Sequence, residues 1–169
     1  DTFVVDENGE EDFETIQGAI DTADEDTTIV VAQGTYDQVT IDKELTLVSR
    51  DGAGETTING TDGTAVTIDV ANVTVDGFTL GSQSADTGVD ADAGDGVVVT
   101  NNSFANVAET GINASDVSDG TVDATSNWWN STNGPSAGEE NTYNDGNQGA
   151  NVTDNVEFTP WLNASTDNN

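Results

Sequence analysis

Short apolar segments alternate with Gly, Asp and Asn over most of the chain, and this pattern predicts a protein built from β-strands. Within most segments apolar and polar residues alternate, as in a strand with one buried face. Asp-Gly and Asn-Gly dipeptides follow many of the segments and are typical of turns. The expected strands are 28–32, 39–41, 45–49, 56–58, 65–70, 73–75, 78–80, 97–100 and 120–124.

One stretch, residues 12–23, has the spacing of an amphipathic helix instead. Asp12 is the expected N-cap, because its carboxylate can accept from the first free N–H groups of a helix. A helix of about three turns is too short to build the core, so it is an accessory to the strands. Five apolar residues share one face of this expected helix: Phe13, Ile16, Ala19, Ile20 and Ala23.

The apolar pattern repeats about every 24 residues. Residues 73–75 recur as 97–99, and 87–91 recur as 110–114. A period near 24 with three short strands fits one coil of a β-solenoid, whose coils stack about 4.8 Å apart. A β-sandwich also has strands at this density but gives no reason for inward residues to repeat at a constant step. The pattern therefore favours an all-β solenoid of about six coils.

The three tryptophans are assigned from the same period. Trp128 lies one step beyond Leu80 and Phe104, so it is expected to fill the last coil. Trp129 is expected to point the other way, under the loop 130–155, and Trp161 to help close the C-terminal end. A sugar-stacking platform is the alternative role for these rings.

Two stretches resemble right-handed parallel β-helix proteins. Residues 15–21 and the four segments after them, up to Leu45-Thr46-Leu47, are similar to the opening of pectin methylesterases and NosD-type β-helix proteins. Asn127-Trp128-Trp129 and the later segment 158–162 resemble the terminal part of secreted archaeal members. The resemblance implies a right-handed parallel β-helix with a helix over its N-terminal end. The four segments of the opening are 28–31, 34–36, 39–41 and 45–47.

The resemblance and the pattern together predict one domain with three parts. Residues 1–26 form an N-terminal strand and the capping helix, and residues 27–129 form the coils. Residues 130–169 form a loop and a final strand, around 156–161, that close or link the solenoid.

Charge changes the picture, because the 169 residues include 33 Asp or Glu and only two Lys or Arg, a net charge of −31. Such a chain repels phosphate backbones and anionic lipids, so no nucleic acid partner is expected. The sequence also has no apolar run long enough to insert into a membrane. High charge is typical of disorder, but recurring Val and Ile favour a folded halophilic protein. At molar salt the Debye length falls to about 3 Å, and surface carboxylates then repel each other little.

No catalytic or cofactor-binding residue is predicted, and the chain is expected not to be an enzyme. The absence of His and Cys excludes Ser-His-Asp catalysis and imidazole or thiolate metal sites. The resemblance to esterases implies a central Asp pair and a later Arg, but their motifs are missing here. Polysaccharide lyases need basic residues, and only Lys43 and Arg50 exist. A suitably spaced carboxylate pair for a hydrolase can arise by chance among 33 acids.

An acidic segment is the candidate metal site. Asp90, Asp92 and Asp95, with Asp86 before them, place carboxylates at short intervals, and Ca²⁺ prefers such oxygen ligands. The spacing differs by one residue from the EF-hand pattern, and no Glu follows at the twelfth position. The alternative is a solvated acidic turn.

The surface and the ends of the stack supply the functional hypothesis. Seven Asn-X-Ser/Thr sequons predict N-linked glycans and an extracellular or cell-surface location, although an Asn- and Thr-rich turn composition is the alternative. A stack of parallel coils has two unlike ends, and unpaired edges recruit other chains. We therefore expect a structural protein of the archaeal cell surface that assembles head to tail with itself into a filament or layer. The sequons are at Asn59, Asn72, Asn101, Asn113, Asn130, Asn151 and Asn163.

Two alternatives stay open. One is a carbohydrate-active enzyme or polysaccharide-binding β-helix module, and the other is a monomeric β-helix domain of a larger surface protein.

Overall fold

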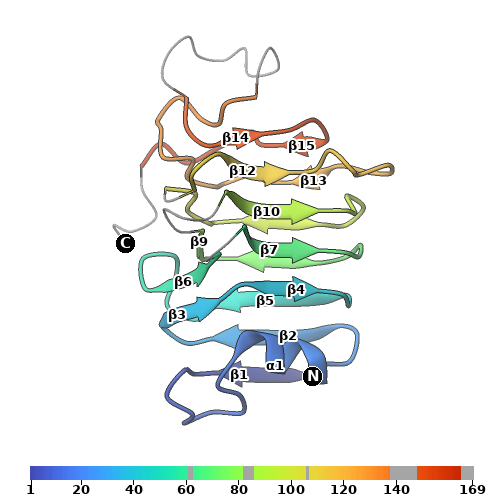
Figure 1. Cartoon of the computed structure of the whole chain (residues 1–169), viewed down its shortest axis with the longest axis vertical. Helices are drawn as coiled ribbons and strands as arrows, with labels where there is room; N and C mark the ends of the chain where they lie inside the picture. Colours follow the sequence, from blue (N-terminus) through green and yellow to red (C-terminus); the bar gives the residue numbers. More distant parts are fainter. Residues whose placement is uncertain (61–62, 82–85, 106, 138–147, 165–169) are drawn as a thin grey trace.

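The protein consists mostly of β-strands in three parallel sheets, with one short helix. The computed structural model describes residues 1–60, 63–81, 86–105, 107–137 and 148–164. Every strand pair among these residues is parallel. The strands lie one above another along the long axis of the molecule (Figure 1). The expected all-β class and parallel pairing are thus confirmed, and the antiparallel pairs of a β-sandwich do not occur in the described parts of the chain.

Successive strands of each sheet come from successive segments of the chain. The seven-stranded sheet has the order β1 (Thr2–Val5), β2 (Thr27–Val31), β5 (Leu45–Ser49), β8 (Thr74–Asp76), β11 (Val98–Thr100), β13 (Val122–Asp123) and β15 (Val156–Glu157). The five-stranded sheet has the order β14 (Asn151–Val152), β12 (Thr110–Asn113), β10 (Thr87–Ala91), β7 (Thr64–Ile68) and β4 (Val39–Ile41). The three-stranded sheet contains β3 (Gly34–Asp37), β6 (Thr56–Asn59) and β9 (Thr79–Leu80).

The strand register stacks apolar side chains into one continuous core. Ile29 lies opposite Leu47, and Leu47 lies opposite Val75, which in turn lies opposite Val99. All four side chains are fully buried. Because alternate residues of a strand face opposite sides, the residues between them face outward and are polar or half-buried. The buried column supplies the main hydrophobic stabilisation of each added strand.

The helix is shorter than expected, and its N-cap is a different residue. Helix α1 spans Ile16–Thr22, and the Thr15 hydroxyl accepts from the Gly18 N–H at 3.2 Å. The expectation that Asp12 caps the helix is therefore wrong. Phe13 forms a parallel bridge with Val5, which keeps the chain before Thr15 extended.

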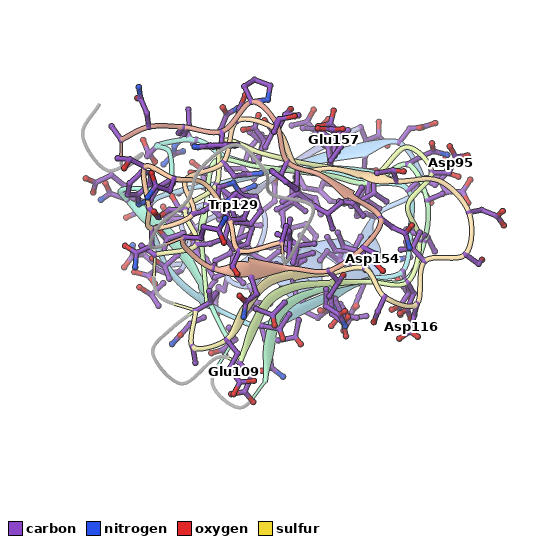
Figure 2. All side chains as sticks on the ribbon, turned by 90° about the horizontal axis from the view of Figure 1, so that it is seen from above. Asp95, Glu109, Asp116, Trp129, Asp154 and Glu157 are labelled. Carbon is purple, nitrogen blue, oxygen red and sulfur yellow. The ribbon has the colours of Figure 1, made fainter. Side chains whose placement is uncertain are left out.

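Trp129, and not Trp128, fills the core of the last repeat. Its side chain is fully buried and stacks on Phe104, with ring centroids 4.7 Å apart and an interplanar angle of 8°. Figure 2, which looks along the stack, shows Trp129 in the interior. Trp128 is half-buried and lies opposite Ser103. The assignment failed because this repeat is one residue longer: Thr79 aligns with Ser103 after 24 positions, and Ser103 with Trp128 after 25.

Two fully buried asparagines join neighbouring repeats at a turn. The Asn102 side chain accepts from the Phe78 N–H at 2.8 Å and donates to the Val75 carbonyl at 2.9 Å. One repeat later, Asn127 accepts from the Asn102 N–H at 2.8 Å and donates to two buried carbonyls. The asparagines therefore replace backbone pairing where the chain leaves the sheet, so no buried peptide group is left without a partner there.

Candidate functional site: a polar pocket beside the seven-stranded sheet

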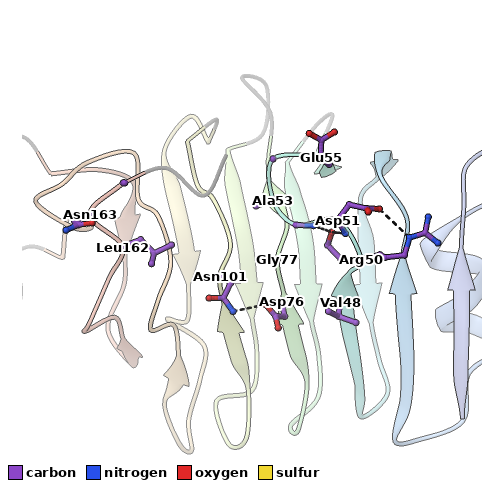
Figure 3. A pocket seen from close by; sticks show the side chains of 14 residues that line it. Val48, Arg50, Asp51, Ala53, Glu55, Asp76, Gly77, Asn101, Leu162 and Asn163 are labelled. Carbon is purple, nitrogen blue, oxygen red and sulfur yellow. Dashed lines mark hydrogen bonds and ion pairs between the residues drawn. The ribbon is translucent and has the colours of Figure 1, made fainter. Parts of the chain in front are cut away.

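A pocket of about 630 Å³ lies beside the seven-stranded sheet, and we call it the turn pocket. It crosses three neighbouring strands, since Val48 lies in β5, Asp76 in β8, and Asn101 directly follows β11 (Figure 3). Its volume is within the range of ligand pockets in proteins. The lining residues are Val48, Ser49, Arg50, Asp51, Gly52, Ala53, Gly54, Glu55, Asp76, Gly77, Asn101, Leu162, Asn163 and Ala164.

The loop between β5 and β6 forms one wall of the turn pocket, and local hydrogen bonds fix it. The Ser49 hydroxyl accepts from the Gly52 N–H at 2.9 Å and donates to the Thr56 hydroxyl at 2.8 Å. Gly52 has a φ of +86°, in the left-handed region that favours glycine. The carbonyl of Ala53 accepts from the Thr79 hydroxyl at 2.7 Å, which ties the loop to the next repeat. The wall is therefore pre-formed.

Three charged side chains of the turn pocket, Arg50, Asp51 and Asp76, already have polar partners. Arg50 Nε lies 3.4 Å from the Asp51 carboxylate, and Arg50 Nη1 lies 3.8 Å from Glu11. Asp51 also accepts from the Gln33 N–H at 3.0 Å. Asn101 donates to the Asp76 carboxylate at 2.9 Å. Both ion pairs are exposed and contribute little to stability, but they take up the cation that would otherwise attract an anionic ligand.

Lys43, the other cation of the chain, has a structural position. Its Nζ donates to the carbonyls of Ile20 and Asp21 at 3.0 and 2.9 Å. These carbonyls belong to the last turn of α1, where a positive charge is favourable. Lys43 and Arg50 therefore do not converge on one site, and the turn pocket contains a single basic residue.

The three aspartates of the candidate metal site do not form a cage. The described residues contain no group of three or more carboxylates placed to hold a metal ion. Asp90 lies in β10 and accepts from Asn113 at 2.8 Å, while Asp92 and Asp95 are exposed on the turn that follows. Figure 2 shows Asp95 at the periphery of the molecule. Calcium binding by these residues stays a prediction.

Burial raises the pKa of the Asp90 carboxyl above its usual range. The hydrogen bond from Asn113 opposes this increase, while the negative charges of Asp92, Asp116 and Asp69 add to it. The folded protein therefore holds this proton to a higher pH than the unfolded chain. Stability is consequently lost as the pH rises through the folded-state pKa.

Asp90→Asn is expected to stabilise the protein at pH 7 by about 0.5 kcal/mol, a small value because the carboxylate is partly exposed and screened. The substituted amide oxygen still accepts from Asn113, so only the charge is removed. Urea denaturation at fixed salt measures the change, and the gain should vanish below the carboxyl pKa. Asp95→Asn removes the same charge from an exposed position and serves as control. An equal gain from both variants would show that net charge, not burial at Asp90, is responsible.

The sequons differ in the environment of their asparagine. Five are exposed, whereas Asn59 and Asn113 are half-buried, and the Asn113 amide already donates to Asp90. The third residues of the Asn59 and Asn163 sequons, Thr61 and Ser165, lie outside the described residues. The exposed asparagines are Asn72, Asn101, Asn130, Asn151 and Asn163.

Comparison with known proteins identifies no relative: no protein family, curated protein or solved structure matches the chain. Among the described residues, no helix has the length and apolar character needed to cross a bilayer.

Sequence reasoning did not find the turn pocket. It assigned Asn101 only a glycosylation sequon and Asp76 no role, and the two are separated by 25 positions in the sequence. The parallel pairing of β8 with β11 brings them together. The repeat length of about 24 was the available signal, because residues one repeat apart become neighbours across strands.

Proposed function

We propose that the three sheets are the faces of one right-handed parallel β-helix of about six coils. The support is the recurring order of the strands: a strand of the seven-stranded sheet is followed by strands of the other sheets before the chain returns one position further along the stack. Parallel strands that are joined by a crossover have this hand in nearly all proteins. The short helix α1 then covers the N-terminal end of this β-helix.

The function that this geometry supports best is that of a non-enzymatic structural module at the surface of a haloarchaeal cell. The observation that carries the proposal is the commitment of both cations to the fold, since Lys43 binds helix carbonyls and Arg50 binds carboxylates. The charge of −31 supports the halophilic part, and the seven sequons support the extracellular part. Growth into a filament or surface layer, and N-linked glycans on the exposed sequons, belong to the same proposal.

Two measurements test the structural role. Incubation with acidic and neutral polysaccharides at molar salt should release no reducing ends or unsaturated products, whereas steady release would contradict the proposal. Electron microscopy of the purified protein separates discrete particles, expected for a module of a larger surface protein, from filaments, expected for a self-assembling subunit. The mass of the protein from a glycosylating host, compared with that of the polypeptide, tests the glycans.

Polysaccharide binding in the turn pocket is the second candidate function. The pocket is pre-formed and has a polar side chain at each of the three strands it crosses, namely Ser49, Asp76 and Asn101. Three acids, Asp51, Glu55 and Asp76, face a single cation, so a neutral saccharide fits better than a uronate.

If the turn pocket holds a neutral saccharide, Asn101→Trp should abolish binding of neutral hexasaccharides, because the indole would occupy the space between Asp76 and Leu162. Titration calorimetry in molar KCl measures the affinity. Asn151→Trp adds the same ring at an exposed sequon asparagine that does not line the pocket, and it should leave the affinity unchanged. Equal affinity of both variants would place any bound saccharide elsewhere.

A further inference from the structure

The first end of the stack has three outermost strands, one in each sheet: β1, β3 and β4. In a parallel pair, alternate residues of the outermost strand direct their N–H and C=O away from the inner strand. Such free groups accept a strand from another chain unless something covers them. In this protein residues 6–17 cover all three edges, and we call this segment the latch.

Gln17 of the latch covers the edge of the five-stranded sheet. Its Oε1 accepts from the Thr40 N–H at 2.9 Å, and its Nε2 donates to the Thr40 carbonyl at 3.2 Å. Thr40 is the middle residue of β4. Nε2 also donates to the Asp21 carboxylate at 2.8 Å, which holds the amide in place. A single side-chain amide thus supplies the donor and the acceptor that the backbone of a further strand would supply.

Asp12 and Phe13 cover the edge of the seven-stranded sheet. The Val4 N–H donates to the Asp12 carboxylate at 2.9 Å, and the Val4 carbonyl accepts from the Phe13 N–H at 3.2 Å. The Asp6 N–H donates to the Phe13 carbonyl at 2.9 Å. This end of β1 therefore has partners for the groups that face away from β2.

Glu7 covers the edge of the three-stranded sheet. Its carboxylate accepts from the Thr35 N–H at 3.3 Å. A Cβ atom added to Gly34 would lie 2.9 Å from the Glu7 carboxyl carbon, so the carboxyl group lies directly against the backbone of β3. The same latch therefore reaches the third sheet as well.

We propose that the latch closes the first end to strand addition, and that the partner it excludes is an extended strand of a second copy of this chain. A second copy is the fitting partner because its strands repeat the same inward apolar column and would continue the core, whereas an unrelated strand would not. Glu7, Asp12 and Gln17 are the key side chains, since each supplies a contact that a strand backbone would replace. This inference goes beyond the proposed function and restricts it, because head-to-tail growth then requires the latch to leave the first end.

The test removes the three side chains together. The Glu7→Ala, Asp12→Ala and Gln17→Ala triple variant should self-associate with at least about a tenfold lower dissociation constant than the unchanged protein, a factor worth about 1.4 kcal/mol. Sedimentation velocity over a range of concentrations in molar KCl, where charge repulsion is screened, gives the constant. Amide hydrogen exchange at Val4, Thr35 and Thr40 should become faster in dilute samples and slow again on association.

A matched control removes the same chemical groups nearby. Glu25→Ala, Asp24→Ala and Gln33→Ala change three exposed residues outside the latch, and this variant should stay as monomeric as the unchanged protein. A folded triple latch variant that shows no added association would overturn the proposal, as would equal association of the control. If the triple variant does not fold, Gln17→Ala alone decides, because faster exchange at Thr40 without association contradicts the proposal.

Discussion

Transfer from about 1 M to about 0.01 M salt is expected to unfold the protein, because the Debye length rises from about 3 to about 30 Å. The net charge is −31, and parallel stacking aligns like charges instead of alternating them. Three aspartates follow aligned residues of β4, β7 and β10, so their backbones lie about 4.8 Å apart. Circular dichroism at decreasing KCl concentration should show cooperative loss of the strand signal. The three are Asp42, Asp69 and Asp92.

Neutral substitutions test whether the aligned aspartates cause the unfolding at low salt. The Asp69→Asn and Asp92→Asn double variant should unfold at a lower salt concentration than the unchanged protein, because like charges on adjacent strands are destabilising. Asp24→Asn with Glu25→Gln removes two charges from the exposed turn after α1 and should shift the midpoint less. An identical strand signal at high and low salt would contradict the halophilic interpretation.

Asn102→Ala is expected to lower the free energy of unfolding by about 3 kcal/mol or more. The substitution leaves the Phe78 N–H and the Val75 carbonyl buried without their partner, at about 1–3 kcal/mol for each group. It also leaves a small cavity between two repeats. Urea denaturation in molar KCl measures the loss, which is large compared with the total stability of a typical domain.

The neighbouring residue provides a matched control. Asn101 is exposed, donates one side-chain hydrogen bond to Asp76 and has a φ of +54°, so Asn101→Ala should lower the stability by only about 1 kcal/mol, mainly through the left-handed backbone. Asn102→Asp keeps the acceptor for Phe78 but buries a charge, and it should be as destabilising as the alanine. Similar losses for Asn101→Ala and Asn102→Ala would show that the buried asparagine does not join the repeats.

The sequence pattern predicted the strands best where apolar residues alternate strictly. The expected segments 39–41 and 45–49 coincide with β4 and β5, because each has buried residues at alternate positions. The expected strand 120–124 is longer than the observed one, because only Val122–Asp123 form β13. Strand β12, Thr110–Asn113, was seen only as a repeat of 87–91, since its single large apolar residue, Ile112, gives no alternation.

Two glycines meet a packing requirement that the hydrophobic pattern of the sequence did not reveal. Gly88 and Gly111 occupy buried positions beside large rings: a Cβ atom on Gly88 would lie 2.8 Å from the Phe104 ring, and one on Gly111 would lie 2.9 Å from the Trp129 ring. The glycine of the recurring Thr-Gly therefore leaves space for the stacked rings of Phe104 and Trp129. The need for glycine at these positions could not be predicted, because side-chain volume in a neighbouring repeat cannot be read from local sequence.

The candidate site was less predictable than the fold. Local sequence gives no sign that Arg50 pairs with Glu11, 39 positions earlier. The aspartates that it singled out at 90–95 are spread over a strand and a turn. Contacts between repeats depend on the lengths of the turns, and one added residue displaced Trp128 by a full position.

The unequal strand lengths give the molecule a strong end and a weak end. Strands β2 and β5 pair over five residues near the first end, whereas β13, β14 and β15 contain two residues each. Because each repeat contacts only its neighbours, the stack behaves as a one-dimensional array in which opening can begin at either terminus. Under mechanical load or mild denaturation, unfolding should therefore start at β15 and proceed toward β1. A partly unfolded molecule would then still retain the paired strands β2 and β5 near its first end.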